Sequence, residues 1–106
     1  MSTKGKPYPA LGHLLGAYFH QDWQLDDPDP GAVVDRFLRD EPPERAQEVV
    51  RDIDQVLRAN LAPAKLEELL ARDLGSAYYP PADGKTWADW LRGLRDRLAQ
   101  GAKKKP

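Results

Sequence analysis

Several residue types are absent or scarce in this sequence, and each absence narrows what the protein can do. There is no cysteine, which excludes disulfides and thiolate chemistry and removes any need for an oxidising compartment. No apolar run approaches the roughly 18 residues that a membrane-spanning helix needs. The formal net charge is only −1, so the molecule as a whole is not drawn to nucleic acid or to a membrane surface. We therefore expect a cytoplasmic protein that binds neither.

Residues suited to catalysis or metal binding are also few. The two serines, Ser2 and Ser76, show no sign of activation by a neighbouring base. The two histidines, His13 and His20, are seven residues apart and share a helix face, but a metal site needs three or four ligands and no second pair completes one. No GxxxxGK phosphate-binding loop is present. The sequence predicts no enzyme, no cofactor and no metal site.

Apolar residues recur at helical spacing along most of the chain, and no segment alternates with the period of two that strands require. Proline and capping residues mark the helix starts, which predicts helices near residues 9–20, 30–41, 43–57, 63–74 and 87–98, with a loop at 76–84. A chain of 106 residues accommodates one core. We predict an all-α fold, a single compact bundle of about five helices at residues 8–100, between a disordered N-terminus at 1–7 and a disordered basic tail at 101–106.

Charge is distributed unevenly along the chain. Residues 20–54 contain eleven acids and four arginines, a net charge of −7, whereas residues 85–106 carry seven basic and two acidic residues, a net charge of +5. Within the acidic part, Asp22, Asp26, Asp27 and Asp29 have no basic residue among them and repel one another. A basic partner would relieve that repulsion and would be attracted by it. A solvated loop in which Asp29 caps a helix explains the same four residues equally well.

Three further features each allow two interpretations. Trp23 lies beyond the apolar face of the first helix, where it either closes the end of the bundle or anchors a partner. Tyr79 precedes two prolines and either holds a loop on the core or presents a stiff binding edge. Gly12 and Gly16 form a flat stripe on the first helix, against which a neighbouring helix or a partner backbone would pack.

Six stretches follow one another between Tyr8 and Leu98: YPAL (8–11), GAYFHQDW (16–23), VVD (33–35), EPP (41–43), YPPADG (79–84) and WL (90–91). Together they resemble the immunity proteins of contact-dependent growth inhibition systems, and the stretch from Tyr18 to Trp23 is the most distinctive. The resemblance implies a small cytoplasmic protein that binds the toxic C-terminal domain of a growth-inhibition effector. It would neutralise that domain by binding, without turnover.

Under this resemblance the acids supply charge complementarity and two aromatic residues serve as anchors. The expected contacts are Asp22, Asp26, Asp27, Asp29, Glu41 and Glu44, with Trp23 and Tyr79. Such toxin domains are often nucleases, and an acidic surface would imitate nucleic acid or cover a site beside a basic cleft. We expect the free protein to be a monomer.

Two alternatives remain open. The first is a small helical adaptor or regulatory protein that binds a different basic protein. The second is a nucleic-acid binder that uses the basic residues near the C-terminus, which are Arg92, Arg95, Arg97 and Lys103 to Lys105.

Overall fold

The structure is a computed structural model, and it describes residues 7–104. Within that range no residue forms a strand, which confirms the predicted all-α class. The helices are α1 (Pro9–His13), α2 (Trp23–Asp26), α3 (Pro30–Asp40), α4 (Pro43–Arg58), α5 (Pro63–Glu67) and α6 (Trp87–Lys104). Wider π-helical turns extend α1 through Leu14–Tyr18 and α5 through Glu68–Asp73, and a 3-10 turn covers Pro80–Asp83.

The helix starts follow the sequence signals. Pro9, Pro30, Pro43 and Pro63 each occupy the first helical position, where the missing N–H costs no hydrogen bond. The Asp29 side chain accepts the Ala32 N–H at 2.8 Å and caps α3 as expected. One element was not predicted separately: α2 is a single turn in what the sequence indicated as a loop.

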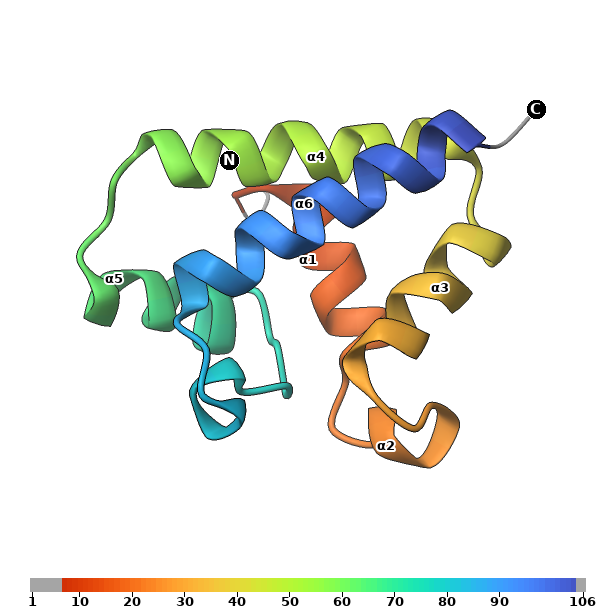
Figure 1. The fold of residues 1–106 in the computed structure, drawn as a ribbon. Coiled ribbons are helices and arrows are strands. Elements are labelled where there is room, and N and C mark those ends of the chain that lie inside the picture. The colour runs from red at the N-terminus through yellow and green to blue at the C-terminus, as the bar shows by residue number, and fades with distance from the viewer. Residues whose placement is uncertain (1–6, 105–106) are drawn as a thin grey trace, which may run out of the picture.

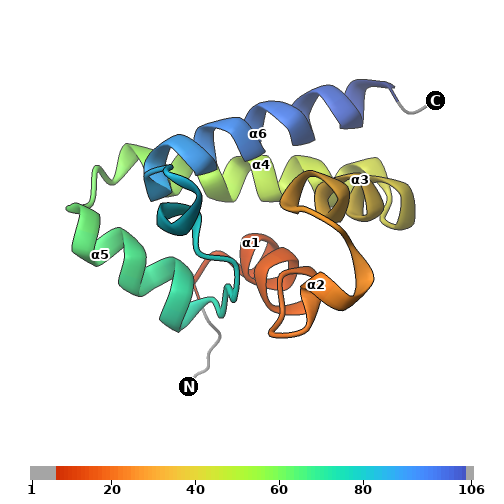
Figure 2. The ribbon, with the colours of Figure 1, turned by 60° about the horizontal axis from the view of Figure 1, so that its bottom comes forward.

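The long helices α4 and α6 lie side by side, and α1 crosses beneath them between α3 and α5 (Figure 1, Figure 2). The Asp52 side chain on α4 fixes this crossing because its Oδ2 accepts the N–H groups of Ala10 (2.9 Å) and Leu11 (3.0 Å) at the start of α1. Each of these three helices contributes fully buried apolar side chains to the core, among them Leu11 of α1, Ile53 of α4 and Leu91 of α6. In Figure 1, α2 and the Pro80–Asp83 turn lie at the end of the molecule away from α4.

The glycine stripe on the first helix faces another part of the same chain. A Cβ added to Gly12 would lie 3.4 Å from Leu74 Cδ2, and one added to Gly16 would lie 3.8 Å from the Leu74 carbonyl oxygen. Leu74 follows the π-helical extension of α5 and is 3% exposed. Gly12 therefore packs against this neighbouring segment, whereas Gly16 is exposed.

The last helix is longer than the sequence pattern indicated. Disorder was expected from residue 101, but α6 continues to Lys104, and Ala102 is 8% exposed. The reason is a long-range contact: a Cβ on Gly101 would lie 2.5 Å from Leu38 Cδ1, so the Leu38 side chain of α3 packs directly on the Gly101 backbone. The predicted disorder at residues 1–6 and 105–106 lies outside the described residues.

Candidate interaction surface

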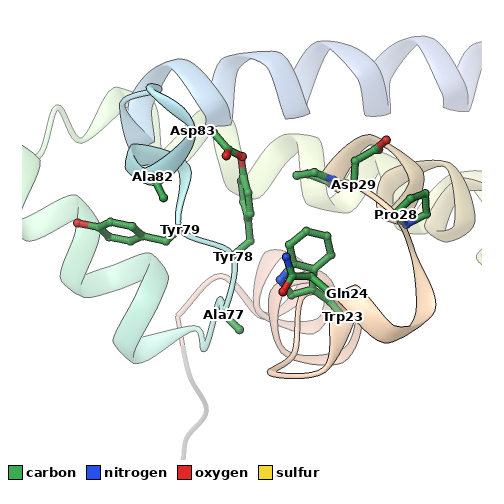
Figure 3. A pocket seen from close by; sticks show the side chains of 10 residues that line it. Trp23, Gln24, Pro28, Asp29, Ala77, Tyr78, Tyr79, Ala82 and Asp83 are labelled. Carbon is green, nitrogen blue, oxygen red and sulfur yellow. The ribbon is translucent and has the colours of Figure 1, made fainter.

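A groove of about 380 Å³ lies between α2 and the loop that precedes α6 (Figure 3). We call it the acidic groove. Two of its lining residues are carboxylates, and its lining, taken within residues 7–104, includes no lysine or arginine. The side chains that line it are Trp23, Gln24, Pro28, Asp29, Pro30, Ala77, Tyr78, Tyr79, Ala82 and Asp83. It thus joins two segments that are about fifty residues apart in the sequence.

Backbone hydrogen bonds hold the 76–79 side of the groove on the rest of the fold. The Ala77 N–H donates to the Phe19 carbonyl oxygen at 2.8 Å, and the Ser76 N–H donates to the Leu70 carbonyl oxygen at 3.0 Å. The Ser76 hydroxyl donates to the Tyr78 carbonyl oxygen at 2.9 Å. This segment is therefore fixed to the ends of two helices rather than free in solvent.

Tyr78 and Asp83 link the two ends of the following turn. The Tyr78 hydroxyl donates to Asp83 Oδ2 at 2.7 Å. Burial of the phenol and this hydrogen bond raise the pKa of Tyr78 to about 12, so the hydroxyl keeps its proton, and this hydrogen bond, at a pH above its ordinary pKa of 10.0. Gly84 ends the turn with φ 80°, a backbone conformation that favours glycine. The carboxylate of Asp83 is thereby held at the edge of the acidic groove, as Figure 3 shows.

Trp23 is a core residue whose edge lines the groove. It is 7% exposed and packs against Phe19 and Tyr78, with ring centroids 6.1 and 5.7 Å away. Trp90 of α6 completes the aromatic cluster, 5.3 Å from the Tyr78 ring. Of the two roles considered for Trp23, the structure places it where it closes the end of the bundle.

The four aspartates around α2 occupy different environments. Asp22 and Asp26 are exposed, and Asp26 lies 3.5 Å from His20 Nε2. Asp29 is exposed and caps α3. Asp27, in contrast, is 8% exposed and accepts the Arg36 Nε–H at 3.0 Å, and this bond raises the pKa of Arg36. Asp27 is therefore a buried structural carboxylate and not part of an open acidic surface.

The remaining expected contacts are divided between two places. Tyr79 lies at the groove, is 48% exposed and packs edge-on against Trp87 at 5.9 Å. Glu41 and Glu44 lie at the junction of α3 and α4, which Figure 1 shows well away from α2. Glu44 is exposed, whereas Glu41 accepts the Tyr18 hydroxyl at 2.7 Å and has a structural role.

Two residues at this surface were not expected from the sequence. Leu25 on α2 is 84% exposed although it is apolar, and the two acids Asp22 and Asp26 lie on the same short segment. The sequence did carry a signal for this exposure. Leu25 lies two residues after the buried Trp23, and residues two apart on a helical turn point in different directions. Asp83 is brought to the groove by the turn, and the proline pair before it was the only hint.

The arginines of the basic alternative are engaged in ion pairs. Arg92 lies 2.9 Å from Asp89, Arg95 lies 2.7 Å from Asp54, and Arg97 lies 2.6 Å from Asp35. Each arginine therefore has a neutralising partner on the molecule, which does not favour a phosphate-binding face.

The described part of the chain offers neither a membrane span nor a metal site. Between residues 7 and 104 no helix is both long and apolar enough to cross a membrane. The same range contains no group of three or more histidine, cysteine or acidic side chains arranged to hold a metal ion. Aromatic residues are enriched at protein interfaces, so a groove lined by Trp23, Tyr78 and Tyr79 is a candidate site for binding another protein.

Comparison with known proteins identifies the family. The model of the CdiI immunity protein family matches residues 7–98. A chain of the crystal structure of a CdiA-CT/CdiI complex from Y. kristensenii is 25% identical, with a TM-score of 0.84, and the match covers 88% of this chain and 99% of that one. No curated protein sequence matches. The chain belongs to the CdiI immunity protein family, and its function is that of a toxin-neutralising immunity protein.

Proposed function

We propose that this chain binds the toxic C-terminal domain of a cognate CdiA-type effector in the cytoplasm of the cell that makes it, and neutralises that domain by stoichiometric binding without turnover. The observation that carries the proposal is the family match over residues 7–98. The similar chain of the Y. kristensenii structure belongs to a complex of CdiA-CT with CdiI, which supports a partner of the same kind here. The free protein is a monomer in this proposal.

The partner surface is basic in this proposal. Asp29 and Asp83 are exposed and line the acidic groove. Asp22 and Asp26 are exposed next to or within α2, the helix that borders it. Asp22 has no ion pair within residues 7–104, so its charge is available to a partner. Charges of one sign on one face speed the encounter with a partner of opposite sign. A nuclease domain carries such a surface because it must hold phosphates.

Leu25 supplies an exposed apolar contact on α2, the helix that borders the acidic groove. A leucine that is 84% exposed gains free energy when a partner covers it, whereas the surrounding carboxylates gain little by desolvation. Tyr79 provides a second, partly exposed anchor on the opposite side of the groove. The proposed contact set is therefore Asp22, Asp26, Asp29, Tyr79 and the edge of Trp23, with Leu25 and Asp83 added. Asp27 contributes indirectly by holding Arg36.

The proposal is tested by growth protection. Cells that express the C-terminal toxin domain encoded immediately upstream of this gene should stop growing, and co-expression of the chain should restore growth. The double variant Asp22→Asn/Asp26→Asn should protect less well, because it removes two exposed charges without disturbing the core. A matched control, Glu48→Gln on α4, removes one exposed charge elsewhere and should protect fully. Failure of the unaltered chain to protect would contradict the proposal and favour an adaptor that binds a different basic protein.

A further inference from the structure

Three depressions lie near the turn at Pro80–Asp83, and residues of the turn line two of them. The acidic groove, which is lined by Ala82 and Asp83, is the first. A second, of about 390 Å³, lies between α3 and α6 and shares Pro30 with the acidic groove. A third, of about 360 Å³, lies between α5 and α6 and shares Lys85 with the second. Pro81 lines this third depression, so the turn lies between it and the acidic groove.

The turn is held in one conformation. It contains two prolines, Pro80 is buried, and the Lys85 N–H donates to the Pro80 carbonyl oxygen at 3.2 Å. The bond from Tyr78 to Asp83 closes its other side at 2.7 Å. A partner that binds a turn already fixed in this way does not have to order it, so less free energy is lost on binding.

The depressions on the two sides of the turn differ in chemistry. The acidic groove has Asp29 and Asp83 and no basic side chain in its lining. The depression between α5 and α6 is lined mainly by apolar groups, among them Leu61, Ala64 and Trp87. We call it the apolar depression.

Tyr79 connects the two. It borders the acidic groove, yet Figure 3 shows its ring directed away from Trp23, and it packs edge-on against Trp87 of the apolar depression. Within residues 7–104, three large apolar side chains are exposed, and Leu61 and Tyr79 at this place are two of them. Exposed apolar groups gathered beside a rigid turn are typical of a protein interface.

We infer that the toxin domain is bound across this turn, with a basic side chain beside Asp83 in the acidic groove and an apolar side chain beside Trp87 in the apolar depression. The inference rests on the proposed function and specifies its partner. We place a basic side chain of the partner in the acidic groove because the lining of the groove has two carboxylates and no basic residue that would neutralise them. Tyr79 borders the acidic groove and contacts Trp87 of the apolar depression. A protein that covers the turn therefore contacts both depressions, and we assign the apolar side chain to the same partner.

Two variants test the two halves of the inference. Asp83→Asn removes the charge but keeps an amide oxygen that accepts the Tyr78 hydroxyl, so the turn is retained. Ala64→Gln places an uncharged side chain in the apolar depression from an exposed position on α5, where glutamine is a good helix former. Glu48→Gln on α4 is the matched charge control. Melting temperature is recorded for each variant to confirm that it is folded.

The measurement is the affinity for the toxin domain encoded upstream, at about 50 mM and about 300 mM salt. Asp83→Asn should weaken binding by at least about fivefold at low salt and by less at high salt, whereas Ala64→Gln should weaken it by at least about fivefold at both. Glu48→Gln should bind normally. If the unaltered chain binds but both variants bind within about twofold of it, the inference is overturned and the proposed function stands. A loss in one variant alone overturns the assignment of the other depression, and no binding by the unaltered chain overturns the proposed function itself.

Discussion

The hydroxyl of Tyr18 donates a 2.7 Å hydrogen bond to the carboxylate of Glu41, which ties the end of the first helix to the end of α3. His13 and Arg45 also approach this carboxylate, at 3.4 and 3.6 Å. Burial of the phenol and this bond raise the pKa of Tyr18 to about 12, and the same bond lowers the pKa of Glu41. Tyr18 begins the most distinctive stretch of the family resemblance, so at least part of that stretch maintains the fold.

Tyr18→Phe should destabilise the fold by about 1–2 kcal/mol near neutral pH, because it removes a hydrogen bond to a carboxylate. The folded pKa of Tyr18 lies above its ordinary value of 10.0, so the contribution is fully present below pH 10.0 and is lost as the pH rises towards about 12. Denaturant unfolding of wild type and variant near pH 8 and near pH 11 measures the free energy that the hydroxyl contributes at each pH. The difference between wild type and variant should shrink at the higher pH, and an unchanged difference would contradict the assignment.

Asp27 and Asp26 are adjacent in the sequence and should behave differently. Asp27→Asn leaves Arg36 without its charged partner in a largely buried site and should cost about 2–4 kcal/mol. Asp26→Asn removes a half-exposed carboxylate and should change stability by less than about 0.5 kcal/mol. Urea unfolding of the two variants measures the change in the free energy of unfolding that each substitution causes. Equal costs would mean that the ion pair of Asp27 is not important to the fold.

Trp23 and Leu25 form a second contrasting pair. Trp23→Ala should lower stability by about 3–5 kcal/mol and lower toxin binding with it, because the ring fills the aromatic cluster. Leu25→Ala should leave the melting temperature unchanged and weaken binding by more than about 1 kcal/mol. Thermal unfolding and calorimetry on the same samples separate the two effects. Normal binding by Leu25→Ala would remove this residue from the interface.

Two glycines on α6 should have opposite effects on the stability of the fold when each is replaced by alanine. A Cβ on Gly93 has no atom within 4 Å, so Gly93→Ala should stabilise the helix by about 1 kcal/mol. A Cβ on Gly101 would overlap Leu38, so Gly101→Ala should destabilise by about 1–3 kcal/mol. Both free energies of unfolding are read from denaturant curves. A stabilising Gly101→Ala would show that the close contact with Leu38 is absent.

The helices were predictable where local signals sufficed. Pro43 at the start of α4 and the apolar period of that helix are both local signals. At the start of α6, the Thr86 hydroxyl oxygen accepts the Asp89 N–H at 3.0 Å, which is a local cap of the same kind. The end of α6 was not predictable in this way. Glycine and a run of lysines indicate fraying, and only the contact with Leu38, more than sixty residues earlier, reverses that expectation.

The difference between local signals and tertiary contacts also explains which features of the candidate surface were predictable from the sequence. The acidic character of residues 22–29 was visible in the sequence, but the burial of Asp27 depends on Arg36 and the burial of Trp23 depends on Tyr78. Both are tertiary contacts that residue types alone do not specify. The groove itself arises because the Phe19 carbonyl oxygen accepts the Ala77 N–H, which brings two distant segments together.

Calorimetric titration of the toxin domain encoded upstream with the purified chain, at low and high salt, tests the central claim most directly. We predict saturation at one chain per toxin domain and an affinity that falls as salt rises, since exposed carboxylates attract a basic surface. An absence of binding at micromolar concentrations would contradict neutralisation of that domain by this chain.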